Sequence, residues 1–153
     1  MTTIVAISDS HMASPAGLSS KLRDALKAAD LIIHAGDQTE STFLDELKTY
    51  GQVVAVAGNM DSTALKLSLP QRQLFTVEGK TIGVAHGSGA PGGIQQRVRA
   101  LFPEDPDIIV YGHSHVPYTG TVKGSLMINP GPASSSYAII KVGNDTRVQI
   151  VHL

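Results

Sequence analysis

Short apolar runs alternate with amphipathic stretches through the first two thirds of the chain. A short apolar run bounded by turn residues is typical of a buried strand, whereas apolar positions three and four residues apart indicate a helix. The apolar runs predict strands at residues 3–8, 31–35, 53–57, 73–77, 81–85 and 107–111.

Apolar residues at helical spacing separate several of these runs. Leu18, Leu22 and Leu26 share one face, and Ser14-Pro15 before them is a good helix start, because serine caps the first turn and proline fits its first position. The segment before residue 73 shows no clear pattern. The spacing predicts helices at 15–29, from about Phe43 to Gly51, and at 94–102.

The pattern changes after residue 116, where strand-like pieces are separated by the turns Lys123-Gly124 and Gly143–Asp145. We expect antiparallel hairpins there, another hairpin at Glu78–Lys80, and β-α-β units with a parallel sheet in the N-terminal part. The chain is therefore expected to be an α/β protein. Two sheets packed face to face, with helices outside, are one way to close it.

Composition narrows the class of protein. A chain of 153 residues is expected to form a single domain, 1–153, and its net charge of −1, without long Lys or Arg runs, argues against bulk nucleic-acid binding. The chain has no cysteine, which excludes disulfides and thiolate chemistry. No signal peptide or membrane-spanning run is apparent, so we expect a cytoplasmic protein without membrane contacts.

Strong metal-ligand side chains follow five of the apolar runs. Sites in open α/β sheets lie at the carboxyl ends of strands, so we expect five strands of one sheet to deliver these side chains to one edge. The residues are Asp9, His11, Asp37, Asn59, His86, His113 and His115. Each alone could be a turn former or an ordinary polar residue, but five such coincidences are improbable.

The number and type of these side chains favour two ions. His113 and His115 are two residues apart, so in an extended segment both point to one side. The set exceeds the needs of a single tetrahedral zinc. Nitrogen and oxygen donors without sulfur suit Mn, Fe, Zn or Ni. Two ions about 4 Å apart can hold a phosphate and activate water between them, so phosphate-ester hydrolysis is the natural chemistry.

Other motifs have simpler interpretations. The stretch 87–92, GSGAPG, matches a dinucleotide-binding pattern, but the next strand does not end in the acidic residue that holds a ribose. We expect a flexible loop beside His86 instead. His34, inside an apolar run, is expected to be buried, hydrogen-bonded and close to the site, and Arg97 and Arg99 to form a solvated surface.

The motif set resembles that of the calcineurin-like metallophosphoesterases. SDSH at 8–11, GD at 36–37, GNMD at 58–61, HG at 86–87 and GHSH at 112–115 are similar in order and spacing to that family's blocks. Length and the Asn129-Pro130-Gly131 stretch resemble its small bacterial and archaeal phosphodiesterase branch, to which the retromer scaffold subunit is related. The resemblance implies a four-layer α/β/β/α sandwich of two mixed sheets.

The resemblance also implies roles for the residues. Asp9, His11 and His115 would bind a first divalent ion, Asn59, His86 and His113 a second, and Asp37 both, with manganese as the expected metal. Asp61 would orient a ligand or a loop. Asp37, Asn59 and His86 would be catalytic, in hydrolysis by a hydroxide that bridges the two ions.

One position departs from the family pattern. Many members have a histidine after the Asn of the GN block, whereas this chain has Met60, which cannot donate a proton to a leaving group. We therefore expect a small or nucleotide-like phosphodiester as substrate. Two alternatives remain: a non-enzymatic scaffold for a protein partner on the same fold, and ions with a purely structural role. A homo-oligomer is possible.

Overall fold

The computed structural model describes residues 1–153 and shows two five-stranded mixed sheets stacked face to face. The first sheet has the order β10 (Thr146–His152), β9 (Ser136–Val142), β1 (Thr2–Ile7), β2 (Leu31–His34) and β3 (Val53–Ala55). The second has the order β4 (Arg72–Val77), β5 (Lys80–Ala85), β6 (Ile108–Tyr111), β8 (Ser125–Asn129) and β7 (Tyr118–Val122).

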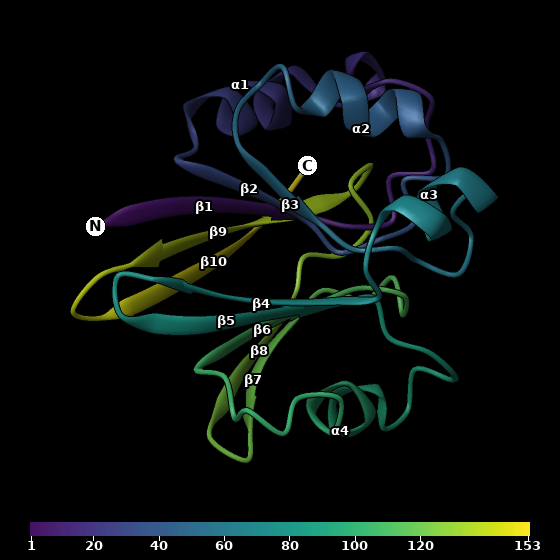
Figure 1. The fold of residues 1–153 in the computed structure, drawn as a ribbon. Coiled ribbons are helices and arrows are strands. Elements are labelled where there is room, and N and C mark those ends of the chain that lie inside the picture. Colours follow the sequence, from purple (N-terminus) through teal and green to yellow (C-terminus); the bar gives the residue numbers. More distant parts are fainter.

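Helices cover the outer faces of both sheets (Figure 1). The first sheet is covered by α1 (Ser20–Ala28) and α2 (Ser41–Leu47), with the short 3₁₀ helix Pro15–Gly17 before them, and the second by α4 (Ile94–Arg99). A further helix, α3 (Thr63–Ser68), lies beside the sheets near the point where β3 leads into the second one. The four-layer α/β/β/α sandwich is thus confirmed.

Apolar residues on both sides of the strands hold the layers together. Along β1, Ile4 and Ala6 belong to a cluster of 14 buried residues between the two sheets, while Val5 and Ile7 pack under α1 and α2. Because strands buried on both faces need apolar residues at every position, they appear in the sequence as continuous apolar runs.

Three details differ from the sequence expectations. The predicted helix 15–29 is interrupted, because Leu18 is extended and the Ser19 side chain accepts the amide of Leu22 to start α1 anew. The helix α3 was not predicted; it is only 6 residues long and is capped by Ser62. The helix predicted at 94–102 ends at Arg99.

The expectation that the five ligand-bearing strands share one sheet was wrong. β1, β2 and β3 lie in the first sheet, whereas β5 and β6 lie in the second. These five strands nevertheless end on the same side of the sandwich, opposite the N-terminus (Figure 1). The loops after these strands therefore face one another across the two sheets. No helix of the protein is long and apolar enough to cross a membrane.

Candidate metal centre

The centre of the candidate site is a contact between residues from different sheets. Nε2 of His86, which follows β5, lies 3.1 Å from Oδ2 of Asp37, which follows β2, and 3.7 Å from Oδ1 of Asp9, which follows β1. All three side chains are buried. Their ligand atoms lie within 4.8 Å of one another, so together they form one possible metal-binding group.

A second group lies beside the first and shares Asp9 with it. Nε2 of His115 lies 3.3 Å from Oδ1 of Asp9, and the ligand atoms of Asp9, His11 and His115 fall within 4.8 Å of one another. Nε2 of His11 also lies 3.7 Å from Oδ2 of Asp37. His11 and His115 are exposed, so this group opens to solvent.

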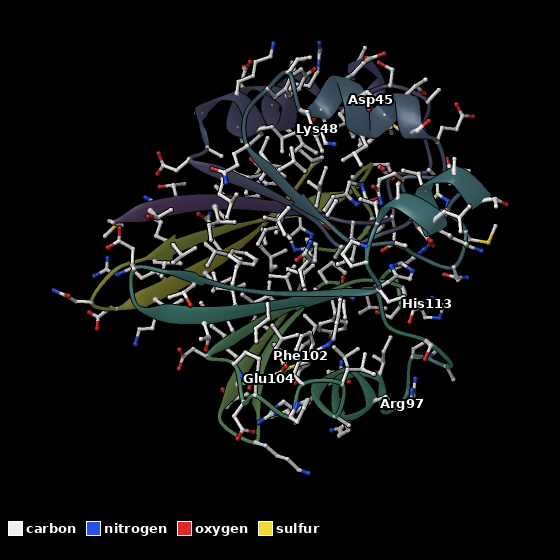
Figure 2. The ribbon with its side chains drawn as sticks, in the orientation of Figure 1. Asp45, Lys48, Arg97, Phe102, Glu104 and His113 are labelled. Atoms are coloured by element: carbon white, nitrogen blue, oxygen red, sulfur yellow. The ribbon has the colours of Figure 1, made fainter.

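Asn59 and His113 extend the first group. Oδ1 of Asn59 lies 3.0 Å from Nε2 of His86 and 3.2 Å from Nδ1 of His113. Figure 2 shows His113 at the end of the sandwich, above Arg97 of α4. All seven candidate ligands named from the sequence are thus brought together.

Backbone carbonyls define which histidine nitrogens face the centre. Nδ1 of His86 lies 2.8 Å from the carbonyl of Ala35, and Nε2 of His113 lies 3.0 Å from the carbonyl of Gly89. A carbonyl only accepts, so each of these nitrogens carries hydrogen. Nε2 of His86 and Nδ1 of His113 are then the nitrogens left to bind a metal.

The charge distribution suits a cation. Burial disfavours protonation of His86, but its hydrogen bond to Asp37 and the negative charges of Asp9 and Asp37 raise its pKa above the ordinary value. Oδ1 of Asp9 is buried and has no hydrogen-bond partner, whereas Oδ2 accepts from the Ser8 hydroxyl at 2.5 Å. A buried, unpartnered carboxylate oxygen among imidazole nitrogens is what a metal ligand requires.

Asp61 ties together the loops after β2 and β3. Its Oδ1 accepts the amide of Thr39 at 2.6 Å, and its Oδ2 accepts the amides of Gly58 at 2.7 Å and Asp37 at 3.1 Å. Oδ2 also accepts the side-chain amide of Gln38 at 3.2 Å. The buried Asp61 carboxylate therefore fixes the backbone that carries Asp37.

His34 connects the loops after β1 and β2. Its Nδ1 accepts the amide of Gly36 at 3.1 Å, so its Nε2 carries hydrogen and donates to the Ser10 hydroxyl at 3.0 Å. Burial lowers the pKa of His34 to about 3. The ring is thus a neutral link between the residues that flank the candidate ligands.

The backbone is strained at the site. Non-glycine residues rarely adopt positive φ, and when they do the strain clusters at functional sites. Five candidate ligands adopt it here: Asp9 (51°), His11 (47°), Asp37 (60°), His113 (76°) and His115 (61°). The contacts around Asp61 and His34 hold two of these loops in that conformation.

The interpretation of Arg97 and Arg99 as a solvated surface is confirmed for Arg97, which is exposed, and was wrong for Arg99. The guanidinium of Arg97 donates to the carbonyls of Ser88, Ala90 and Gly92, and so holds the Gly-rich loop in place. Arg99 is buried and pairs with Asp105 at 2.5 Å. These contacts could not be predicted from the sequence, because their partners are mostly backbone carbonyls.

Comparison with known proteins identifies the family. Residues 2–145 match the model of the calcineurin-like phosphoesterase superfamily domain. A probable metallophosphoesterase of Methanocaldococcus jannaschii is 38% identical over 128 residues, which are 82% of this chain and 65% of that protein. The solution NMR structure of a Thermotoga maritima protein aligns with a TM-score of 0.80 at 32% identity, over 100% of both chains.

More distant structures share the fold. Vps29 of Chaetomium thermophilum has a TM-score of 0.80 at 19% identity, covering 99% of this chain and 94% of that one. An archaeal phosphodiesterase has a TM-score of 0.76 at 19% identity, covering 99% of both chains. The family match over residues 2–145 shows that this protein belongs to the calcineurin-like phosphoesterase superfamily.

Proposed function

We propose that the protein is a metal-dependent phosphodiesterase that uses two divalent ions, with manganese as the expected metal. The observation that carries this proposal is the pair of adjoining donor groups, one with His11 and His115 and one with His86, that meet at the buried carboxylates of Asp9 and Asp37. Two such groups side by side suit two cations rather than one. Bound there, the ions would polarise a phosphate and activate water.

The residues divide between the two ions. Asp9, His11 and His115 would hold the first, and Asn59, His86 and His113 the second. Asp37 would contact both, because its Oδ2 faces the imidazoles of His11 and His86. Asn59 and His86 also line the neighbouring cleft, where they could position a phosphate oxygen.

Met60 favours diesters as substrates. Its side chain is 60% exposed and cannot give a proton to a departing alkoxide. The reaction then depends on a leaving group that is stable as an anion. We therefore expect small or nucleotide-like diesters with such a leaving group to react faster than simple alkyl phosphate monoesters.

The test is hydrolysis of bis(p-nitrophenyl) phosphate with manganese, iron, zinc or nickel, compared with p-nitrophenyl phosphate and with an alkyl monoester, glycerol 2-phosphate. Asp37→Asn should lower kcat/KM by at least about 100-fold, as expected when a ligand shared by two ions loses its charge. Asp45→Asn, on the exposed face of α2, is the matched control (Figure 2). If Asp37→Asn keeps full activity, the shared-ligand role is wrong.

A scaffold role predicts a different result. The protein would then bind metal but hydrolyse no phosphoester, and a partner would co-purify with it. Binding of two metal ions per chain, counted by calorimetry or by elemental analysis, therefore accompanies the assay. Metal binding without hydrolysis of any diester contradicts the proposed enzyme and favours the scaffold.

A further inference from the structure

A cleft of about 450 Å³ opens directly beside the candidate metal centre. Asn59 and His86 form the wall that it shares with the centre, while Lys66 of α3, Gln71, Ser88 and Leu101 line the remainder. Small-molecule sites are commonly concave spaces of this size. A phosphodiester held at Asn59 and His86 would thus have room for one of its ester arms in this cleft.

The cleft contains one lysine without a partner. Lys66 lies in the last turn of α3, its side chain is exposed, and its ammonium forms no ion pair or side-chain hydrogen bond in the structure. The nearby guanidinium of Arg97 is different, because its donors are engaged by loop carbonyls. Lys66 is therefore the cation in this cleft that remains free to bind an anion.

The cleft also has an apolar wall. Leu101, which follows α4, is 49% exposed and contributes one side of the cleft. An exposed leucine beside a free ammonium and the amide of Gln71 suits a ligand group with an apolar ring and a polar end. Since the net charge of the chain is only −1, attraction of an anionic ligand depends on the charges that line the cleft and not on the net charge of the protein.

We propose that this cleft is a subsite for one ester arm of the substrate and that Lys66 selects arms that carry a negatively charged group. The inference rests on the proposed phosphodiesterase function and narrows its substrate class to diesters with an anionic arm. A purely structural role of Lys66 is the alternative, because a cation in the last turn also stabilises the helix end.

Two chromogenic diesters test the subsite. One is p-nitrophenyl 4-carboxyphenyl phosphate, and the other carries an uncharged carboxamide in place of the carboxylate. The wild-type protein should show a KM about three- to tenfold lower for the carboxylate, the range expected for a solvent-screened charge contact. Lys66→Ala should abolish this preference by raising the KM for the carboxylate to that for the carboxamide, as expected for loss of a binding contact.

Lys48→Ala is the matched control, because Lys48 is also exposed at a helix end but lies on α2, away from the cleft (Figure 2). This variant should keep the wild-type preference. A merely structural Lys66 would change the melting temperature but not the ratio of the two KM values. Charge reversal by Lys66→Glu should invert the preference, so that the carboxamide binds better.

A binding measurement separates this inference from the proposed function. The methyl signals of Leu101 are followed by NMR in the zinc-loaded protein during titration with (4-carboxybenzyl)methylphosphinate, which has two P–C bonds and no ester bond to hydrolyse. We expect saturable shifts at Leu101 that weaken in Lys66→Ala. Absence of hydrolysis of both esters would overturn the phosphodiesterase, whereas hydrolysis with equal KM values and no shift at Leu101 would overturn only the subsite.

Discussion

Nε2 of His86 and Oδ2 of Asp37 lie 3.1 Å apart although His86 follows a strand of one sheet and Asp37 a strand of the other. This contact cannot form within either sheet alone. The candidate metal centre is therefore a product of the packing between the two sheets. The variants below test how the surrounding residues hold this arrangement.

Because Gly58 has no side chain, the Asp37 carboxylate can pack directly against its backbone. A Cβ at this position would lie 2.2 Å from Oδ1 of Asp37 and 2.4 Å from its amide nitrogen, so Gly58→Ala must displace the carboxylate or the backbone. We expect a loss of about 1–3 kcal/mol in the free energy of unfolding, typical of overpacking, and weaker metal binding.

Urea denaturation and calorimetric metal titration measure these two effects. Gly51→Ala is the matched control, because a Cβ there would meet only Ile32 at 3.9 Å, an ordinary contact. Gly58→Ala with unchanged metal affinity would show that the position of Asp37 does not matter for binding.

Asp61 accepts four hydrogen bonds through its two oxygens, and a carboxamide, which has one acceptor oxygen, cannot reproduce all of them. In Asp61→Asn one oxygen becomes an NH₂ donor that faces backbone amides, so we expect a loss of about 1–3 kcal/mol in the free energy of unfolding. Because the loop that carries Asp37 would shift, metal affinity should fall about 10- to 100-fold. Calorimetric titration checks this, with Asp45→Asn, which removes an exposed charge, as reference.

The buried His34 should make the free energy of unfolding depend on pH. Burial lowers its pKa from 6.5 to about 3, so between these values the unfolded chain binds more protons at this position than the folded protein does. The contribution of His34 to the free energy of unfolding is therefore complete above pH 6.5 and is lost as the pH falls toward 3. The raised pKa of His86 acts in the opposite direction, so single variants are needed to separate the two.

His34→Gln should flatten the pH dependence in that window and, at neutral pH, cost about 1–3 kcal/mol for the lost contacts with Ser10 and Gly36. The free energy of unfolding by urea is measured at a series of pH values for the wild type and the variant. His152→Gln, at the exposed end of β10, is the matched control.

Arg97 holds the loop whose Gly89 carbonyl contacts His113. Lysine has the same charge but lacks the planar fork of donors that reaches several carbonyls at once. We expect Arg97→Lys to weaken binding of the second ion on the order of tenfold, while the first ion is unaffected. Imidazole nitrogen NMR provides a second measurement, because His113 should lose its preference for hydrogen on Nε2.

The control for Arg97 is Arg147→Lys, an exposed position on β10. Equal affinities of both ions in Arg97→Lys and in the wild type would show that the Gly-rich loop does not position His113.

Metal removal should leave the fold intact. The cluster of 14 buried apolar residues between the sheets contains none of the candidate ligands, so the core does not depend on the ions. After chelation we expect an unchanged far-ultraviolet circular dichroism spectrum and a lower melting temperature, since ligands that bind only the folded state stabilise it by mass action. Unfolding on chelation would indicate structural ions instead.

The sequence was sufficient to predict most strands and the ligand set, because buried strands need continuous apolar residues and because Asp, Asn and His after them are conspicuous. It was insufficient where side chains act on the backbone. Ser19 starts a new helix within an apparently continuous helical pattern. Arg97 binds backbone carbonyls, which are the same for every residue type and so leave no trace in the sequence. The division of the strands between two sheets depends on long-range pairing, which periodicity does not report.

The packed layer between the sheets has a consequence for distant substitutions. Ile4, Ile33, Val84 and Val110 lie in this layer and are not candidate ligands, yet their packing limits how far the two sheets can slide past each other. A slip by one residue along a strand is about 3.3 Å, comparable to the distance between His86 and Asp37. Cavity-forming changes in the interior should therefore reduce turnover before they unfold the molecule, so activity would be a more sensitive indicator of sheet alignment than melting temperature.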